Sequence, residues 1–235
     1  MERCLSVELE TGILYTFPMK RKLPDLALEK KLWEKGYIVI GIDEVGRGAF
    51  AGPLVVGGVV FPPTVNRKRI TKLLSYGIND SKKLKPNARK MLSKVIQNES
   101  LAYHISKVEV GIINRFGIGK ATFIAMRDVV KNLRKSLPNK KNFVLIDKFY
   151  VKHMRGIGLK NQKGIVHGDC ISLSIAAASI VAKVHRDNLM KRLSKKYPDY
   201  NFSKNKGYGT VLHRKVIEKI GATELHRVAF VRKIV

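Results

Sequence analysis

Two adjacent carboxylates, Asp43 and Glu44, end the apolar run 37–42 and stand directly before the sequence Gly46-Arg47-Gly48. The run is short and rich in β-branched residues, which predicts a buried strand. Carboxylates at the end of such a strand lose hydration and need a compensating partner. Divalent cations of the magnesium type prefer carboxylate oxygens as ligands. The pattern therefore predicts a metal site at the end of a strand, facing phosphate.

The charge balance makes these acids more informative. The chain has 46 Lys and Arg against 18 Asp and Glu, a formal net charge of +28, so acidic side chains are scarce. Lys and Arg that neutralise phosphates release condensed counterions, which favours binding to a polyanion. Nucleic acid is the first candidate partner, and an anionic membrane surface is the second.

Targeting and cysteine signals are weak. The sequence has no run of 18 apolar residues, and its N-terminus lacks the apolar segment of a signal peptide. We therefore expect a soluble, cytoplasmic protein without a membrane partner. Cys4 and Cys170 are the only cysteines and lack zinc-type spacing, so neither a disulfide framework nor a zinc site is supported.

Hydrophobic periodicity predicts an α/β fold after a short lead-in at 1–23. We expect strands at 37–42, 54–61, 101–110, 142–147 and 165–167, and helices at 25–33, 86–97, 120–136 and 171–196. Strands come first and then alternate with helices, which is typical of a mixed sheet with helices on its faces. At 235 residues, the chain can form one large domain or one domain with an appendage.

Carboxylates follow apolar strands at three places: Asp43-Glu44, Asp147 and Asp169. Ligands collect beyond the carboxyl ends of strands in sheets of this kind, so these four acids are the candidate metal ligands. Two cations about 3.5–4 Å apart, held by such oxygens, would activate water and stabilise a leaving 3′ oxygen in phosphodiester hydrolysis.

Structural alternatives exist for each acid. Asp169 could cap the helix that follows it, and Asp147 could be a turn residue. Asp43 and Glu44 should face opposite sides of a strand unless the strand ends there, which the following glycines would permit. Asp187 lies 18 positions after Asp169, roughly 27 Å along a continuous helix, so we assign it to a structural pairing with Arg186 or a nearby lysine.

Four motifs, taken together, resemble ribonuclease HII, the type 2 ribonuclease H family. The resemblance covers residues 24–235 and leaves only the lead-in unexplained. The motifs are Asp43-Glu44-Val45-Gly46-Arg47-Gly48 with Ala51-Gly52-Pro53, Asp80-Ser81-Lys82-Lys83-Leu84, the segment 176–184 with Arg186-Asp187, and Lys206-Gly207-Tyr208-Gly209-Thr210.

The resemblance implies a ribonuclease H-like mixed sheet flanked by helices, with a C-terminal helical region from about residue 197. It implies an endonuclease dependent on two Mg²⁺ or Mn²⁺ ions. The expected substrates are the RNA strand of RNA/DNA hybrids and ribonucleotide-containing duplex DNA, cut 5′ of single ribonucleotides during ribonucleotide excision. The expected products carry 3′-hydroxyl and 5′-phosphate ends, and the family default is a monomer.

Carried over residue by residue, the family's four metal-site acids match Asp43, Glu44, Asp147 and Asp169. The same four acids result from the strand-end pattern. The family's glycine-arginine-glycine element matches Gly46, Arg47 and Gly48, which suits a ribose sensor whose backbone amides approach the 2′-hydroxyl while Arg47 reaches a phosphate. Tyr208 matches the family tyrosine that stacks on the sugar after the ribonucleotide.

Further basic and hydroxyl residues match family positions. Ser81, Lys82 and Lys83 could hold backbone phosphates, and their alternative is a solvated loop. Lys183 could contact substrate or serve packing on its helix. The small residues of 171–182 favour close packing on the sheet.

One departure lies directly after Asp147. Many family members have glycine there, whereas this sequence continues with Lys148-Phe149-Tyr150. This is similar to the ribonuclease HIII branch, which acts on continuous hybrids, carries an extra N-terminal domain and lacks the arginine form of the glycine motif. The alternatives to the main hypothesis are therefore a ribonuclease HIII-like enzyme, a resolvase of the same fold, and a non-catalytic binder of RNA/DNA hybrids. The basic stretch 131–163 could add a backbone-binding surface or be a solvated face.

Histidines give no nucleophile pattern. We expect His167, His185 and His213 to be structural or phosphate-facing rather than catalytic bases.

Overall fold

The computed structural model describes residues 4–8, 14–18, 23–63, 84–137 and 141–234, and within 4–8 and 14–18 it describes the backbone only. Ser81, Lys82 and Lys83 lie outside the described residues. The strands β1 (Cys4–Glu8) and β2 (Leu14–Pro18) pair antiparallel within the segment that the sequence indicated only as a lead-in. Alternation over five residues is too short a signal to separate a hairpin from a loop.

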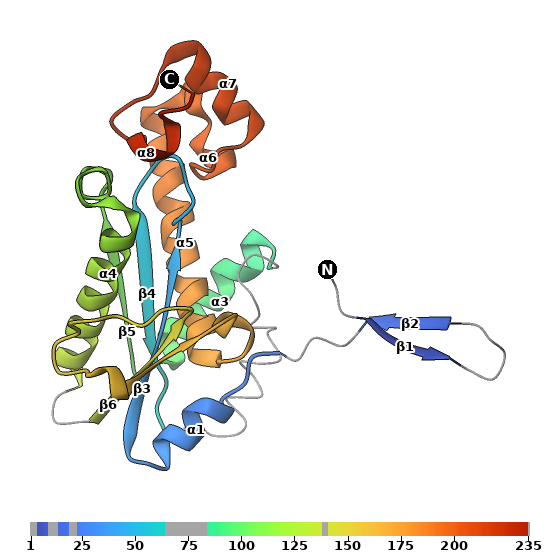
Figure 1. The fold of residues 1–235 in the computed structure, drawn as a ribbon, viewed down its shortest axis with the longest axis vertical. Coiled ribbons are helices and arrows are strands. Elements are labelled where there is room, and N and C mark those ends of the chain that lie inside the picture. The colour runs from blue at the N-terminus through green and yellow to red at the C-terminus, as the bar shows by residue number, and fades with distance from the viewer. Residues whose placement is uncertain (1–3, 9–13, 19–22, 64–83, 138–140, 235) are drawn as a thin grey trace.

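The central sheet has the order β5-β4-β3-β6-β7 (Figure 1). Its strands are β3 (Tyr37–Val45), β4 (Leu54–Val60), β5 (Ala102–Val108), β6 (Lys141–Asp147) and β7 (Gln162–Ile165). β3, β4 and β5 form antiparallel pairs, while β6 and β7 continue the sheet in parallel from β3. The predicted mixed sheet is confirmed.

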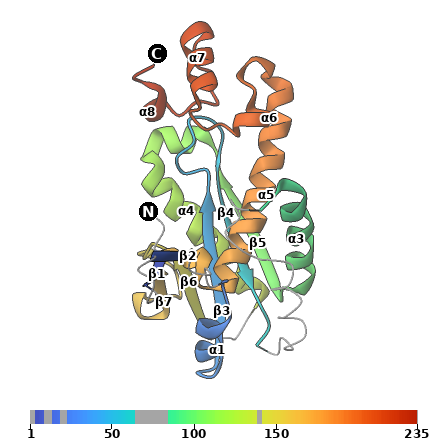
Figure 2. The same ribbon diagram turned by 90° about the vertical axis from the view of Figure 1, so that its right-hand side faces the viewer.

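Helices cover both faces of the sheet (Figures 1 and 2). They are α1 (Ala27–Trp33), α3 (Pro86–Glu99), α4 (Val110–Ser136), α5 (Leu173–Lys196), α6 (Phe202–Asn205), α7 (Val211–Ile220) and α8 (Val228–Val231). α4 lies on one face, and α5 lies on the other with α3 beside it.

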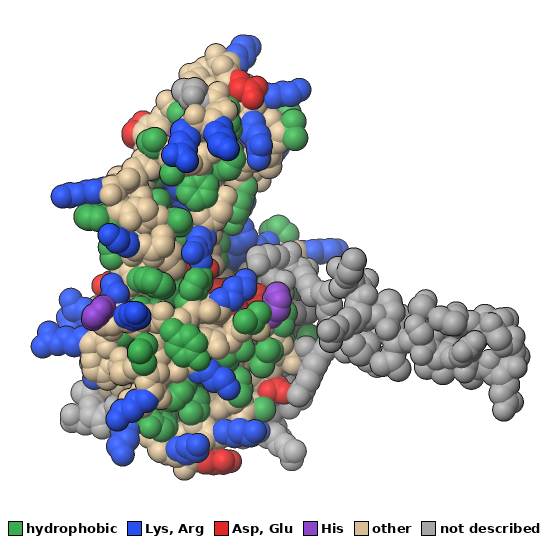
Figure 3. Space-filling model, viewed as in Figure 1, with side chains coloured by type: hydrophobic (Ala, Val, Ile, Leu, Met, Phe, Trp, Pro, Cys, Tyr) green, Lys and Arg blue, Asp and Glu red, His purple; other side chains and the backbone are tan. Residues whose placement is uncertain are grey.

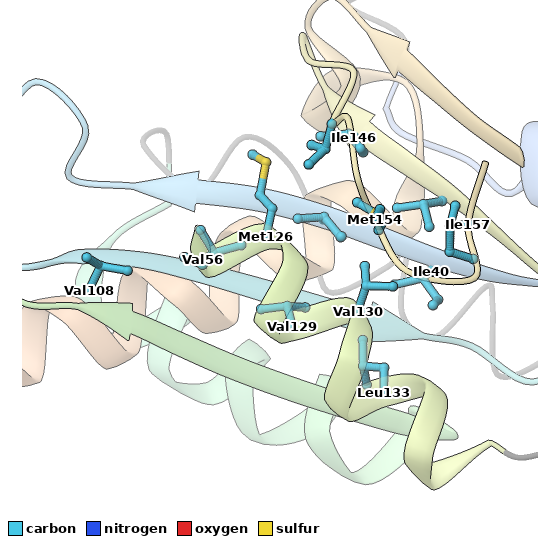
Figure 4. Packing of buried hydrophobic residues seen from close by; sticks show 14 of the residues in the cluster. Ile40, Val56, Val108, Met126, Val129, Val130, Leu133, Ile146, Met154 and Ile157 are labelled. Atoms are coloured by element: carbon cyan, nitrogen blue, oxygen red, sulfur yellow. The ribbon is translucent and has the colours of Figure 1, made fainter. Parts of the chain in front are cut away.

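Strand alternation divides the core between the two faces. Ile40 and Val56 pack with α4, and Figure 4 shows Val129, Val130 and Leu133 of α4 beside them. On the other face, Val59 packs with α3 and α5. The sheet is therefore buried on both sides, as the apolar runs predicted.

The small residues of α5 allow it to lie very close to the sheet. A Cβ added at Gly41 of β3 would lie 2.3 Å from the backbone carbon of Ser174, and one at Gly57 of β4 would lie 2.5 Å from the carbonyl oxygen of Ala178. Glycine on the strands and small side chains on the helix remove the usual spacing between them. This contact holds α5 against the strand that carries Asp43.

Several element boundaries differ from the sequence prediction. α4 begins at Val110, ten positions before the predicted start, and is broken at Gly117, whose φ is 78°. β7 ends at Ile165 rather than at His167, since His167 has a left-handed φ of 56° and turns the chain. α5 begins at Leu173, with the Ser172 hydroxyl accepting a hydrogen bond from the backbone N–H of Ile175.

Beyond α5 the chain forms a helical cluster at one end of the sheet (Figure 1). Tyr200, Phe202, Ile217 and Val231 pack there with Met190 of α5. In the part of the chain that the structure describes, no helix combines the length and apolarity needed to cross a bilayer. Figure 3 shows Lys and Arg side chains spread over the face drawn, with far fewer Asp and Glu.

Candidate functional site

A pocket of about 840 Å³ opens at the carboxyl ends of β3, β6 and β7. The four predicted acids, the glycine-arginine-glycine element, Lys183 and Tyr208 all line it. The full lining is Asp43, Glu44, Val45, Gly46, Arg47, Gly48, Arg89, Asp147, Lys148, His167, Asp169, Cys170, Ser179, Lys183 and Tyr208. Residues from six separate stretches of the sequence therefore face one cavity.

The end of the β3–β6 pairing explains how neighbouring acids reach one pocket. The parallel register runs only to Ile42 and Ile146, whereas β3 itself continues to Val45. The expected strand end after Asp43 was therefore wrong, because β4 continues to pair with β3 there. Because the pairing with β6 ends at Ile42, that edge of β3 is open beyond it, and both Asp43 and Glu44 line the pocket.

Asp43 is buried and lies among like charges. Its exposed fraction is 6%, and its Oδ1 accepts a hydrogen bond of 2.8 Å from the backbone N–H of Glu44. Burial raises the pKa of Asp43 well above its usual value, and the charges of Glu44, Asp147 and Asp169 raise it further, while a hydrogen bond from Ser179 opposes the shift.

Glu44 has a perturbed carboxyl as well. Burial, followed by the charge of Asp147, raises the pKa of Glu44 to about 7, while Arg47 and Lys148 oppose the shift. The Oε2 atom of Glu44 is buried and has no hydrogen-bond partner within the protein. Such an oxygen needs a bound cation or donor to offset its desolvation.

Asp147 and Asp169 complete the acidic group from the other strands. Asp147 ends β6, where its Oδ1 accepts a hydrogen bond of 2.9 Å from the backbone N–H of Gly168 and its Oδ2 lies 3.6 Å from Lys148 Nζ. Asp169 lies in a short 3₁₀ turn, 9% exposed. Ser172 caps α5, so the alternative that Asp169 is the helix cap was wrong.

The chemistry of this group fits hard divalent cations. Four carboxylates line one pocket, their charges repel one another, and the buried oxygen of Glu44 lacks a partner. Among the described residues, no three acid, His or Cys side chains form a ready-made metal cage.

The glycine-arginine-glycine loop turns out of β3 beside these acids. Gly46 has a φ of 89°, and a Cβ there would lie 2.1 Å from Nε of Arg186, so this position accepts only glycine. The half-buried Arg47 places its Cζ 4.5 Å from the ring centroid of Phe149. The loop is thus held by contacts with two residues that lie far along the sequence, Arg186 and Phe149.

Tyr208 reaches the pocket on a loop that packs against the segment after Gly48. The carbonyl of Gly207 accepts hydrogen bonds from the backbone N–H groups of Phe50, at 2.8 Å, and Ala51, at 3.0 Å. A Cβ at Gly207 would lie 2.3 Å from the carbonyl oxygen of Ala51. The guanidinium of Arg186 lies 5.5 Å from the centroid of the Tyr208 ring.

Two buried arginines support both loops. Arg186 donates to the carbonyls of Pro53, Ala51 and Lys206 at 3.0, 3.2 and 2.8 Å. Arg227 lies 0% exposed after α7, and its Nη1 donates to the carbonyls of Gly46 and Arg47 at 2.7 and 2.9 Å. Its Nε and Nη2 both donate to Gly52. Burial, with the charge of Arg186, lowers the pKa of Arg227 to about 9.

Lys183, which lines the pocket, forms an ion pair with Asp187 on α5. Lys183 Nζ lies 2.6 Å from Asp187 Oδ1, and Arg89 Nη1 lies 3.7 Å from Asp187 Oδ2. Burial lowers the pKa of Lys183, while Asp187 raises it. The predicted pairing of Asp187 with a nearby lysine is confirmed, whereas Arg186 is committed to backbone carbonyls.

Several lining residues were not predicted from the sequence as site residues. Arg89 lies on a helix that shows only amphipathic periodicity, so its sequence carries no signal for this role. For Ser179, among small residues, the sequence predicts packing on the sheet. Lys148 departs from the family pattern, which by itself predicts no contact with the site. These residues reach the pocket only because folding brings together segments that are distant in the sequence.

The histidines occupy different environments. His167 is exposed at the edge of the pocket. His213 is buried in the C-terminal cluster, where its Nδ1 lies 2.9 Å from the carbonyl oxygen of Tyr208 and its Nε2 lies 3.2 Å from Nε2 of His226. Burial lowers the pKa of His185 and of His213.

The family model and the most similar relatives that were compared name the same family. The family model described as Ribonuclease HII matches residues 40–233. A ribonuclease HII of Caldicellulosiruptor bescii is 41% identical over 208 residues, which is 88% of this chain and 93% of that protein.

Solved structures agree on the fold. The ribonuclease HII in a complex with PCNA from Archaeoglobus fulgidus has a TM-score of 0.66 at 24% identity, covering 84% of this chain and 95% of that one. Bst-RNase HIII in complex with Mn²⁺ has a TM-score of 0.67 at 21% identity, covering 85% of this chain and 69% of that one. At these identities the likeness concerns the fold.

Proposed function

This chain belongs to the ribonuclease HII family, and we propose that it incises duplex DNA on the 5′ side of single ribonucleotides as well as hydrolysing the RNA strand of RNA/DNA hybrids. Ribonuclease H-type endonuclease activity follows from the family. The cut at isolated ribonucleotides, the two-ion mechanism and the roles of individual residues are the parts that we propose.

One observation carries this proposal: the acids and the predicted ribose-sensing residues line a single pocket. Asp43 and Asp147 line the cavity, and Arg47 and Tyr208 reach it from two loops. A nuclease without ribose discrimination needs the acids but not this arrangement. The convergence therefore favours an enzyme that recognises ribonucleotides over a resolvase of the same fold.

Asp43, Glu44, Asp147 and Asp169 would hold the divalent ions. When bound, two Mg²⁺ or Mn²⁺ ions would supply an activated water and stabilise the leaving 3′ oxygen, giving 3′-hydroxyl and 5′-phosphate ends. The Mn²⁺ complex of the ribonuclease HIII structure supports this choice of ions. The carboxylates themselves fix the positions of the ions and keep the cavity acidic within a basic protein.

The remaining residues would bind and orient the nucleic acid. Arg47 offers a guanidinium to a phosphate, and the backbone amides of Gly46 and Gly48 can approach the 2′-hydroxyl that distinguishes RNA from DNA. Tyr208 would stack on the sugar that follows the ribonucleotide. Lys183 lines the pocket and donates to Asp187, which suits a role in orienting α5 beside the substrate.

Ser81, Lys82 and Lys83 remain predicted phosphate contacts. The monomeric state and the cytoplasmic location also remain predictions from the sequence. A basic surface of this extent suits the backbone of a duplex. A non-catalytic hybrid binder is less favoured, because four repelling carboxylates in the pocket oppose binding of phosphate unless cations are present.

The test is cleavage of a labelled DNA duplex that contains one ribonucleotide, with Mg²⁺, Mn²⁺ or EDTA, mapping the cut to the nucleotide. We expect metal-dependent incision 5′ of the ribonucleotide, and loss of incision in Asp43→Asn with duplex binding retained. Glu218→Gln, an exposed acid on α7, is the matched control. Cleavage of continuous hybrids alone would support the ribonuclease HIII-like alternative, and binding without cleavage would support the non-catalytic one.

A further inference from the structure

The sequence departure after Asp147 forms a tight turn. Lys148 has a φ of 66°, and the backbone N–H of Phe149 donates to the carbonyl of Asp147 at 2.9 Å. The N–H of Lys148 donates to the carbonyl of Ile165, which ties the turn to β7. The chain therefore reverses direction directly after the acid, and Phe149 follows this reversal.

Phe149 is held in place from several sides. Its ring packs edge-on against Phe123 of α4, with centroids 6.1 Å apart and an interplanar angle of 81°. Its carbonyl oxygen lies where a side chain at Gly164 would be, 2.7 Å from an added Cβ. The ring is half-buried at the edge of the core that α4 forms with the sheet. A ring fixed in this way can act as a support for another side chain.

Arg47 rests on that support. Its Cζ lies 4.5 Å from the ring centroid of Phe149, well within the range of a cation–π contact. Its charge also acts on Glu44. A cation–π attraction uses no hydrogen-bond acceptor, so the N–H groups of the guanidinium stay available for a phosphate. Arginine loses rotamer freedom when it is fixed, and a preformed contact removes part of that cost from substrate binding.

We propose that Phe149 is a positioning residue that holds the Arg47 guanidinium ready for a phosphate of the ribonucleotide-containing strand. The inference rests on the proposed function, since it takes Arg47 as a substrate contact. It assigns a role to a residue in the segment after Asp147, where the sequence departs from the family pattern. Phe149 acts through Arg47 and does not itself contact the reacting atoms.

The experiment measures steady-state cleavage of a duplex with one embedded ribonucleotide by the wild type, Phe149→Leu, Phe149→Tyr, Arg47→Ala and the double variant Arg47→Ala/Phe149→Leu. We expect Phe149→Leu to raise KM about two- to tenfold with kcat nearly unchanged, because a preformed contact aids binding in the ground and transition states alike. Phe149→Tyr keeps a ring and should restore KM. In the Arg47→Ala background, Phe149→Leu should cause no further increase in KM.

A matched control lies on α4. Arg115 lies 5.0 Å from the ring of Phe116, a similar pair that does not line the pocket, and Phe116→Leu should leave KM unchanged. Equal KM values for Phe149→Leu and the wild type would overturn the inference. An increase in KM that Phe149→Leu still causes when residue 47 is alanine would overturn it as well. Thermal melting checks folding, and Phe149→Met replaces the leucine variant if that one is unstable.

The inference and the proposed function can fail separately. If the wild type incises and Arg47→Ala impairs it while Phe149→Leu does not, only the inference fails. If the wild type does not incise, the proposed function fails. The same cycle is then measured as binding of the duplex by fluorescence anisotropy in the Asp43→Asn background, where equal affinities with and without the Phe149 ring would overturn the inference.

Discussion

Arg227 donates a hydrogen bond of 2.7 Å to the carbonyl oxygen of Gly46, a residue 181 positions earlier in the sequence. The side chain is fully buried, and its other donors bind the carbonyls of Arg47 and Gly52. The C-terminal cluster therefore holds the loop that presents Arg47. Removal of this guanidinium would leave several buried carbonyls without donors.

Arg227→Met should lower the free energy of unfolding by about 3 kcal/mol, because unsatisfied buried acceptors retain their desolvation cost. Chemical denaturation measures the change. Arg232→Met, an exposed arginine in the same region, should be close to neutral and serves as the control. Equal effects of the two substitutions would contradict the role assigned to Arg227.

Asp43→Asn should stabilise the protein in EDTA by about 1 kcal/mol, since it removes one of several repelling buried charges at a functional site. Mn²⁺ should raise the melting temperature of the wild type more than that of the variant, because ligands that bind only the folded state stabilise it. Differential scanning fluorimetry with and without Mn²⁺ measures both effects. An identical response to Mn²⁺ would argue against Asp43 as a ligand.

Gly41→Ala should destabilise the protein by about 3 kcal/mol, because the new methyl group would meet the backbone of α5 at Ser174. Gly119→Ala is the matched control: it lies in α4 with open space around it, and alanine should add about 0.5–1 kcal/mol there. Urea unfolding of both variants tests the contact. A tolerated Gly41→Ala would mean that α5 can move away from the sheet.

Acidification should weaken the C-terminal cluster through His226. Burial, with the nearby His213, lowers the pKa of His226 from 6.5 to about 4. The unfolded chain binds this proton first, so the contribution is complete above pH 6.5 and is lost as the pH falls toward 4, by about 3 kcal/mol at most.

The measurement is the free energy of unfolding between pH 7 and 4 for the wild type and for His226→Asn. The variant should show a shallower loss, whatever its stability at pH 7. His153→Asn changes an exposed histidine with a positive φ that asparagine tolerates, so it should keep the slope of the wild type. Parallel curves for all three proteins would contradict the assignment to His226.

The sequence predicted the strands that carry the acids because their signals are local. The run 37–42 and the strand before Asp147 are short, apolar and bounded by polar residues. β7 was placed too late, because it contains Gly164 at the close approach to Phe149 and so lacks a clear apolar pattern. The hairpin β1–β2 in the lead-in was not predicted, because its strands of five residues are too short for a clear alternation signal.

The acids of the candidate site could be predicted, but their supports could not. Asp43 and Asp147 follow strands whose parallel pairing puts their ends together. The contacts Arg47–Phe149 and Arg227–Gly46 join residues that no spacing rule relates, and Asp169 could be separated from a helix cap only once Ser172 was seen to fill that position. A buried arginine that donates to backbone carbonyls leaves no trace in a hydropathy pattern.

The contact between Gly46 and Arg227 also sets an order of events during synthesis. Ribosomes add about 5–20 residues per second, so the 181 positions between them correspond to roughly ten to forty seconds of elongation. During that interval the nascent chain carries Asp43 and Glu44 but not the guanidinium that holds the neighbouring loop. A half-made molecule thus contains its acidic residues before it contains the donor that holds the Arg47 loop, so this loop gains its support last.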